Sequence, residues 1–358
     1  MKKKLVSLAL VAAMAFSLVA CGGAAEDTAP VVDNNDNTTT DAPANNGESF
    51  KIGIVTDIGG VNDGSFNQSA WEGLQKAMAD LGVEGSYLQS ASDADYATNI
   101  ETFIDEDTDL IICVGYMLAA ATQEAAEANP DQMFAIIDDS SIDLPNVQCL
   151  MFKQEQASYL VGYVAGLMTE TNKVGFELGM QSEAMDLFGY GYIAGVKDAN
   201  PDCAVLQRNA NSFGDTATGK TDGNAMITEG ADIIFHAAGG TGLGTIDACA
   251  EAGIKAIGVD SDQHAVAEGT VITSAMKRVD NAVIDVVNQI VNGTFKGGVT
   301  TYDLSVGGVD LAPTTTYLPA EVLAQVEDVK AKILSGEIVV PSTKAEFEAA
   351  YGDAYELD

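Results

Sequence analysis

Short apolar runs alternate with longer stretches of helical periodicity from residue 50 onward. Strands of a parallel sheet that is covered on both faces are apolar throughout, so the runs predict buried strands and the stretches between them predict helices. The expected strands are residues 51–56, 85–89, 109–115, 133–138, 147–152, 173–178, 204–208, 232–238 and 255–260. The expected helices are residues 67–81, 95–105, 119–129, 185–199, 216–229, 244–252, 280–291 and 320–334. This alternation predicts the α/β class with parallel sheets.

The pattern occurs twice along the chain. Residues 109–115 are followed by a helix and then by a strand that ends in Asp138, and residues 232–238 are followed by a helix and then by a strand that ends in Asp260. Two similar lobes in tandem are the simplest interpretation. Carboxylates and glycines follow the strand ends in each lobe, and open α/β sheets bind ligands there. We therefore expect one cleft between two lobes whose strand ends face each other.

The first 21 residues have the pattern of a secretory signal. Three lysines follow Met1, residues 5–18 are apolar, and the segment ends in Leu18-Val19-Ala20-Cys21. The apolar run is shorter than the roughly 20 residues that a spanning helix needs. The ending resembles a bacterial lipobox, so we expect residues 1–20 to be a lipoprotein signal peptide, Cys21 to carry lipid, and residues 21–48 to be a flexible tether. An ordinary signal peptide with a chance cysteine is the alternative.

The charge balance excludes one class of partner. The chain has 53 acidic and 17 basic residues, a net charge of −36, and removal of the signal would take away three of the lysines. Such a surface repels phosphate backbones, so we expect no binding to nucleic acid. It also repels anionic lipid headgroups, so a lipid rather than a basic patch would hold the protein at a membrane. Because 47% of the residues are hydrophobic, the chain can still form cores.

Signals for an enzyme are weak. Cys113, Cys149, Cys203 and Cys249 have no metal-binding spacing, and we interpret them as buried free thiols, with a disulfide as the alternative. His236 continues an apolar strand and is expected in the core. The sequence contains no G-x-S-x-G or H-E-x-x-H motif. We therefore expect neither catalysis nor a cofactor.

The loop after the first strand is the densest candidate site. Asp57 stands at the strand end, where its carboxylate can accept hydrogen bonds from hydroxyl groups, and Phe66 offers a flat face to an aromatic ligand. Asn67 can both donate and accept. Asp63 or Ser65 is expected to cap the next helix instead of binding a ligand.

The second lobe has a comparable set of residues. Phe213 lies in a polar loop before a helix, where it can form the other side of an aromatic sandwich, and Asp215 is expected to cap that helix. Gly239 and Gly240 open a glycine-rich loop that approximates a phosphate-binding loop without its full spacing; close approach of the backbone to a neutral ligand explains it equally well.

Two charged residues complete the candidate site. Asp260 ends a strand of the second lobe as Asp57 ends one of the first. Lys277 is expected at a turn, where it can donate to a hydroxyl group or pair with Asp260.

Four blocks of the sequence resemble the basic membrane protein family of ABC-transporter binding lipoproteins, whose members bind purine nucleosides. The blocks are residues 57–73, 159–166, 191–197 and 257–263, and the resemblance covers about residues 50–340. It implies a two-lobed flytrap fold of the type I periplasmic-binding class, two Rossmann-like lobes joined by a hinge. It also implies a monomer whose partners are an ABC permease and its ATPase. The implied boundaries are 49–152 plus about 278–298 for lobe 1, 153–277 plus about 299–320 for lobe 2, and a helical segment at 321–358.

The resemblance also implies roles for the candidate residues. It places a purine between Phe66 and Phe213, and the ribose against Asp57, Asp260, Lys277 and the backbone near Gly239. Tyr116 falls in the block after the third strand and is included in the implied site. Ala120 stands where an aspartate that reads the base edge is common, so the ribose end matches the family better than the base end.

We therefore expect a lipid-anchored, extracytoplasmic nucleoside-binding protein of an ABC importer. A different solute such as a sugar, or a sensory role without transport, is the first alternative. An extracytoplasmic dehydrogenase or hydrolase is the second, and only the glycine-rich loop supports it.

Overall fold

The computed structural model of the chain describes residues 49–357. The expected signal peptide, the lipid site at Cys21 and the tether lie outside the described residues. Within the described part, no helix combines the length and the apolar character that crossing a membrane requires.

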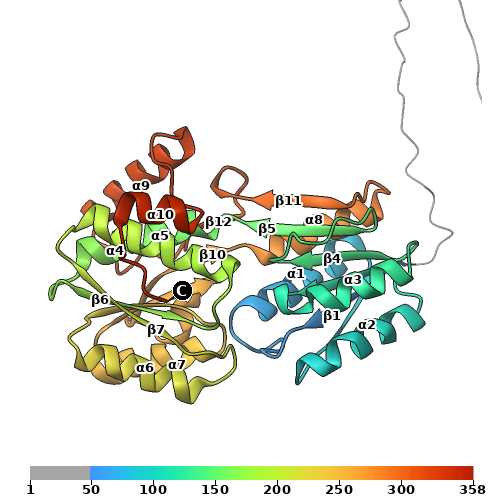
Figure 1. The fold of residues 1–358 in the computed structure, drawn as a ribbon, viewed down its shortest axis with the longest axis horizontal. Coiled ribbons are helices and arrows are strands. Elements are labelled where there is room, and N and C mark those ends of the chain that lie inside the picture. The colour runs from blue at the N-terminus through green and yellow to red at the C-terminus, as the bar shows by residue number, and fades with distance from the viewer. Residues whose placement is uncertain (1–48, 358) are drawn as a thin grey trace, which may run out of the picture. The chain divides into compact units, whose positions relative to one another are not determined.

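The first sheet belongs to lobe 1 and has the strand order β11–β5–β4–β3–β1–β2, with every neighbouring pair parallel. Its strands are β1 (Lys51–Thr56), β2 (Glu84–Leu88), β3 (Leu110–Val114), β4 (Met133–Ile137), β5 (Val147–Phe152) and β11 (Gly298–Tyr302). Helices α1 (Phe66–Leu81) and α8 (Val279–Val291) pack on one face, and α2 (Tyr96–Asp105) and α3 (Ala119–Ala128) pack on the other (Figure 1).

The second sheet belongs to lobe 2 and has the order β12–β10–β9–β8–β6–β7, in which only β12 is antiparallel to its neighbour. Its strands are β6 (Lys173–Leu178), β7 (Ala204–Asn209), β8 (Ile233–Ala237), β9 (Lys255–Asp260), β10 (Val271–Lys277) and β12 (Val309–Leu311). Helices α4 (Gln154–Met168) and α5 (Glu183–Ala199) cover one face, and α6 (Thr216–Thr228) and α7 (Thr241–Ala252) cover the other. Four short 3₁₀ helices complete the lobes: η1 (Asp93–Asp95), η2 (Tyr116–Leu118), η3 (Gln263–Val266) and η4 (Leu304–Val306).

The expected α/β class with two parallel lobes is confirmed. All the strands and helices expected from the sequence are present, with ends that differ by at most three residues. Strands β10, β11 and β12 and helices α4 and α10 (Lys344–Tyr351) were not predicted. The hydrophobic pattern did not predict helix α4 because almost every side of this helix is buried. It therefore lacks the polar stripe of a surface helix.

The chain passes between the lobes three times. It does so after β5, after β10 and after β11. The expected third boundary near residue 298 is wrong, because β11 continues to Tyr302 and pairs with β5 of lobe 1.

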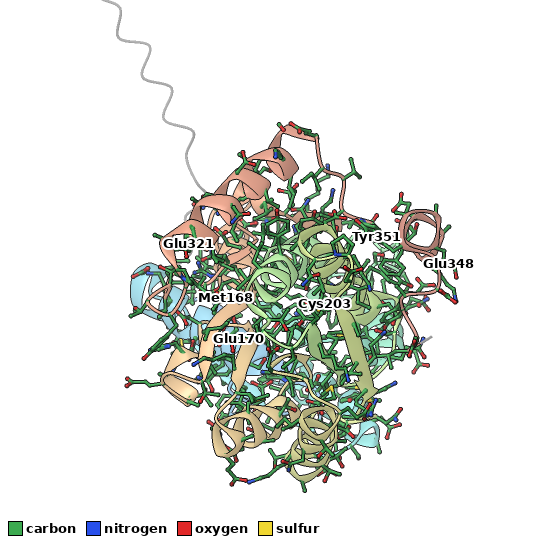
Figure 2. The ribbon with its side chains drawn as sticks, turned by 90° about the vertical axis from the view of Figure 1, so that its left-hand side faces the viewer. Met168, Glu170, Cys203, Glu321, Glu348 and Tyr351 are labelled. Atoms are coloured by element: carbon green, nitrogen blue, oxygen red, sulfur yellow. The ribbon has the colours of Figure 1, made fainter. Side chains whose placement is uncertain are left out.

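The C-terminal segment at 321–358, which was expected to be helical, packs onto lobe 2. Helix α9 (Ala320–Ser335) contacts α4, and the Tyr355 hydroxyl donates to Asp186 Oδ1 at 2.6 Å. Figure 2 shows the outer end of this lobe, where Glu348 of α10 lies on the outer side. Tyr351 lies on the inner side and donates to Asp198 Oδ2 at 3.1 Å. Burial of Tyr355 against Tyr190 of α5, together with these hydrogen bonds, makes the segment part of the lobe.

The residues expected in the core are buried. Cys113, Cys149, Cys203 and Cys249 are all free thiols with no disulfide between them. His236 is fully buried in β8.

Candidate functional site

The strand ends of both lobes surround one cavity. It is lined by aromatic, apolar and charged side chains, a combination that is typical of small-molecule sites. Lobe 1 contributes residues that follow β1, β3 and β4, and lobe 2 contributes residues at β8, β9, β10 and the start of α5. The cavity therefore lies at the position where open α/β sheets bind ligands.

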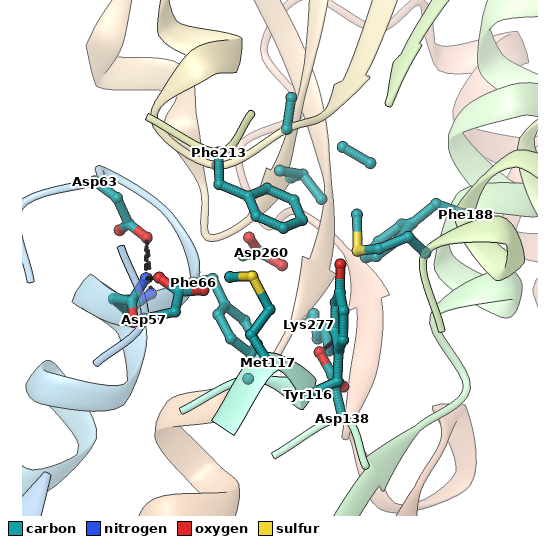
Figure 3. Close-up of a pocket in the computed structure, with 17 residues that line it drawn as sticks. Asp57, Asp63, Phe66, Tyr116, Met117, Asp138, Phe188, Phe213, Asp260 and Lys277 are labelled. Carbon is teal, nitrogen blue, oxygen red and sulfur yellow. Dashed lines mark hydrogen bonds and ion pairs between the residues drawn. The ribbon is translucent and has the colours of Figure 1, made fainter. Parts of the chain in front are cut away.

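The structure brings most of the sequence-predicted site residues together around this cavity. Those that line it are Asp57, Phe66, Asn67, Tyr116, Phe213, Gly239, Asp260 and Lys277 (Figure 3). Gly240 is not among the lining residues. Among the described residues, the glycine-rich loop therefore reaches the cavity only through Gly239.

Asp57 is fixed by the loop that follows β1. Its Oδ1 accepts hydrogen bonds from the Gly59 amide at 2.8 Å and from Asn67 Nδ2 at 2.7 Å. Burial raises the pKa of the carboxyl group to about 6, and the hydrogen bonds oppose part of that shift. The Asp57 carboxyl group therefore gains or loses its proton at about pH 6. Its ionised form is the stronger hydrogen-bond acceptor.

Asp63 caps helix α1, as expected. Its two carboxylate oxygens accept hydrogen bonds from the backbone amides of Ser65, Asn67 and Gln68 at 2.9–3.1 Å. These amides belong to the first turn, which has no partners within the helix. The cap fixes the start of the helix and with it the direction in which Phe66 and Asn67 point.

Asn67 has one polar atom left over. Its Nδ2 donates to both Asp57 and Asp63, whereas its Oδ1 is buried without a hydrogen-bond partner among the described residues. A buried acceptor without a partner is costly, roughly 1–3 kcal/mol, unless a ligand or water supplies the donor. Because Asn67 lines the cavity, a ligand in the cavity is the natural source of that donor.

Phe66 and Phe213 enter the cavity from opposite lobes. Figure 3 shows the two rings projecting toward the same space, with Asp260 behind them. The Phe213 loop is held by Thr241, whose hydroxyl donates to the Ser212 carbonyl at 2.9 Å and accepts from the Asp215 amide at 2.9 Å. Asp215 caps α6, as expected, by accepting from Ala217 and Thr218.

Lys277 ends strand β10 and does not lie at a turn. Its Nζ pairs with Asp138 Oδ2 of lobe 1 at 2.5 Å, so the expected pairing with Asp260 is not the one that forms. The ammonium group also lies 5.1–5.5 Å from the ring centres of Phe66, Phe152 and Phe188. Attraction to these ring faces compensates for part of the cost of burying the charge.

Asp138 and Asp260 occupy equivalent positions in the two lobes. Each follows or ends a central strand, with φ of 66° and 63°, a left-handed conformation that Asp tolerates better than most residues. Burial raises the pKa of Asp260 to about 7, opposed by the charge of Lys277 and by a hydrogen bond from Ser65 Oγ. Asp138 Oδ1 is buried without a partner among the described residues.

Asp138 is a site residue that sequence reasoning missed. The matching halves already aligned it with Asp260, and that match could have identified it. The other lining residues without a prediction are mostly apolar: Met117, Met185, Phe188, Ala237, Ala238 and Val259.

The interpretation of Ala120 is wrong. Ala120 is exposed on α3 and does not line the cavity. The residues after β3 that do line it are Gly115, Tyr116 and Met117. The absence of an acid at position 120 therefore says nothing about the base end of the cavity.

The arrangement suits a flat, donor-rich ligand. Two phenyl rings provide apolar faces, and Asp57, Asp138 and Asp260 provide acceptors for hydroxyl or amino groups. Lys277 is the only cation among the described residues that line the cavity, and Asp138 already occupies one of its N–H groups. An anionic ligand would therefore meet more negative than positive charge.

Comparison with known proteins identifies the family. The model of the Bmp family, described as ABC transporter substrate-binding protein PnrA-like, matches residues 50–344. The chain is 41% identical to the CD4+ T-cell-stimulating antigen of Listeria innocua, over 95% of this chain and 99% of that protein. It is 37% identical to the ABC transporter nucleoside-binding protein BmpA of Lactococcus lactis, over 82% and 89% of the two chains.

A solved structure agrees with this assignment. A solute-binding protein of an ABC transporter system from Aeropyrum pernix superposes with a TM-score of 0.78 at 26% identity, over 85% of this chain and 97% of that one. The chain belongs to the Bmp family of PnrA-like ABC transporter substrate-binding proteins.

Proposed function

We propose that this substrate-binding protein takes up a nucleoside, with a purine as the favoured base. The observation that supports this most directly is the pair of phenyl rings, Phe66 and Phe213, which enter one cavity from opposite lobes. Stacking on two aromatic faces suits a planar base, and each such contact is worth about 0.5–1.5 kcal/mol beyond the area it buries. A relative named as a nucleoside-binding protein supports the same ligand class.

The polar groups fit the sugar. Asp57 and Asp260 accept hydrogen bonds from ribose hydroxyls, Lys277 donates to one of them, and the backbone at Gly239 approaches closely because no side chain intervenes. Because the cavity holds more negative than positive charge, an unphosphorylated nucleoside fits it better than a nucleotide does.

The protein works outside the cytoplasm and delivers its ligand to a permease that an ATPase drives. Lipid on Cys21 and the tether over residues 21–48 keep a monomeric binding protein close to that permease. It binds without catalysis or a cofactor, in keeping with the names of its relatives as binding proteins.

Isothermal titration calorimetry with a ligand panel tests the proposal. The panel contains purine nucleosides, pyrimidine nucleosides, free bases, pentoses and amino acids. We expect the tightest binding with a purine nucleoside and a loss of about tenfold or more in Phe213→Ala, which removes one stacking face. Binding of a sugar but of no nucleoside would falsify the proposal. Unchanged affinity in Phe213→Ala would refute the stacking geometry alone.

A further inference from the structure

Gln263 makes a hydrogen bond from lobe 2 to the loop of lobe 1 that carries the site. Only 2% of its surface is exposed, and its Nε2 donates to the Gly64 carbonyl at 2.9 Å. Its Oε1 accepts from the Val259 amide at 2.9 Å and contacts His236 Nε2 at 2.9 Å. Gln263 does not line the cavity, but Val259, to which it is hydrogen-bonded, does.

The backbone fixes the orientation of this amide. The Val259 N–H can only donate and the Gly64 carbonyl can only accept, so the Gln263 side chain cannot be flipped. His236 Nε2 must therefore carry the proton and donate to Gln263 Oε1. His236 Nδ1 then holds a lone pair, in agreement with its lack of any partner among the described residues. Burial lowers the pKa of His236 to about 4, so the imidazole is neutral near neutral pH.

A second hydrogen bond joins the same two segments. Ser65, next to Gly64, donates through its hydroxyl to Asp260 Oδ2, and both residues are buried. Gly64 and Ser65 directly precede Phe66, and Asp260 directly follows Val259. The two interlobe hydrogen bonds therefore set the distance between the stacking ring of lobe 1 and the carboxylate of lobe 2.

We infer that Gln263 is a positioning residue that holds the two walls of the cavity in register, and that His236 acts through it by fixing its rotamer. The hydrogen bond joins two protein groups across the lobes in this arrangement, so it favours the arrangement of the lobes that encloses a ligand. This inference goes beyond the proposed function, since it holds for any ligand that the cavity takes.

Gln263→Glu tests the inference with little change in shape. The introduced carboxylate can still accept from Val259 and His236 but cannot donate to the Gly64 carbonyl. We expect amides of residues 58–65 to exchange with deuterium faster than in the wild type, in the full chain without ligand. We also expect a purine nucleoside to dissociate about tenfold faster, which corresponds to the ~1.4 kcal/mol of one hydrogen bond, with its association rate little changed.

Acidification supplies a readout that a purely structural defect would not give. A protonated carboxyl group regains an O–H donor, so lowering the pH should restore slow nucleoside dissociation in Gln263→Glu. The wild type is measured over the same pH range, because the pKa values of Asp57 and Asp260, at about 6 and about 7, fall in it. The junction also faces His236, Asp63, Asp138 and Lys277, which contact Gln263 or Ser65 or act on the charge of Asp260.

Gln207→Glu is the matched control. Gln207 is also buried, and its Nε2 donates to the Ala354 carbonyl at 2.9 Å, but within lobe 2. The Gln207→Glu variant should lower thermal stability without changing deuterium exchange at residues 58–65 or the rate of nucleoside dissociation.

Equal effects of the two variants, or no recovery of slow nucleoside dissociation in Gln263→Glu at low pH, would overturn the inference. If the wild type binds no nucleoside, the proposed function fails, and unchanged exchange in Gln263→Glu then decides against the positioning role independently.

Discussion

At the scale of single residues, the ion pair of Lys277 and Asp138 places two buried charges, one from each lobe, side by side in the cavity wall. The two side chains are only 2% and 6% exposed. Taking two charges out of water costs more than a surface pair does, and such pairs are often no more stabilising than apolar residues of the same size. The pair therefore has a clearer role in presenting charge to a ligand than in stabilising the fold.

A double-variant experiment separates these two roles. Asp138→Asn should lower the free energy of unfolding by about 3–5 kcal/mol, because it leaves Lys277 buried without its ionised partner. Adding Lys277→Met should restore part of that loss, since the three phenyl rings around Nζ suit an apolar chain. Urea unfolding at pH 7 measures both. A double variant that is less stable than Asp138→Asn alone would contradict this account, and both variants should bind ligand more weakly.

The sequence alone could locate Asp57, Phe66, Phe213 and Asp260, because each follows a strand end or opens a loop. It could not assign the partner of Lys277. That partner lies 139 residues earlier in the chain, and only the packing of the two lobes brings the two together.

At the scale of elements, helices α4 and α5 cross unusually closely. A Cβ atom at Gly191 would lie 2.1 Å from the Glu155 carbonyl oxygen, and one at Gly195 would lie 2.1 Å from the Tyr159 carbonyl oxygen. Both contacts are to backbone, which cannot move aside as a flexible side chain can. The glycine-containing blocks at 159–166 and 191–197 therefore serve helix packing in lobe 2 and not ligand binding.

Gly191→Ala should lower the free energy of unfolding by about 1–3 kcal/mol, because the two helices must separate to admit the methyl group. Thermal unfolding measures the loss. Gly214→Ala is the control, since the nearest atom to a Cβ there is the Ile58 carbonyl oxygen at 3.9 Å. Equal melting temperatures of the two variants would show that the helix crossing tolerates a side chain.

Periodicity predicted the surface helices and the central strands, and it failed where elements are fully enclosed or paired at long range. Helix α4 lies between sheet and outer helices, so it has no polar face for a pattern to reveal. Strand β11 joins the sheet of lobe 1 by pairing with β5, about 150 residues earlier, and its exposed residues give no apolar run. Both are tertiary effects that a local window does not contain.

At the scale of the whole molecule, most acidic groups lie on the surface, but a few are buried in the folded protein. The chain has a net charge of −36, and the surface carries most of it. Yet Glu155 in α4 and Glu177 in β6 are buried, 3% and 0% exposed, away from the cavity. Each has one carboxyl oxygen without a partner among the described residues. These two groups and the cavity carboxylates make stability depend on pH.

Burial raises the pKa of Glu155 to about 7 and that of Glu177 to about 8, and it raises those of Asp57 and Asp260 to about 6 and about 7. A carboxyl group with a raised pKa in the folded state gives its full contribution below its unfolded pKa and loses it as the pH rises through the folded value. Stability should therefore fall by a few kcal/mol between about pH 4 and about pH 8.

Urea unfolding at pH 5 and at pH 8 measures the fall. Glu177→Gln should reduce it, whereas Glu124→Gln on the exposed side of α3 should not. Stability that is constant or rises over this range would show that the buried carboxyl groups ionise without cost, and a fall that Glu177→Gln leaves intact would assign it to the remaining groups.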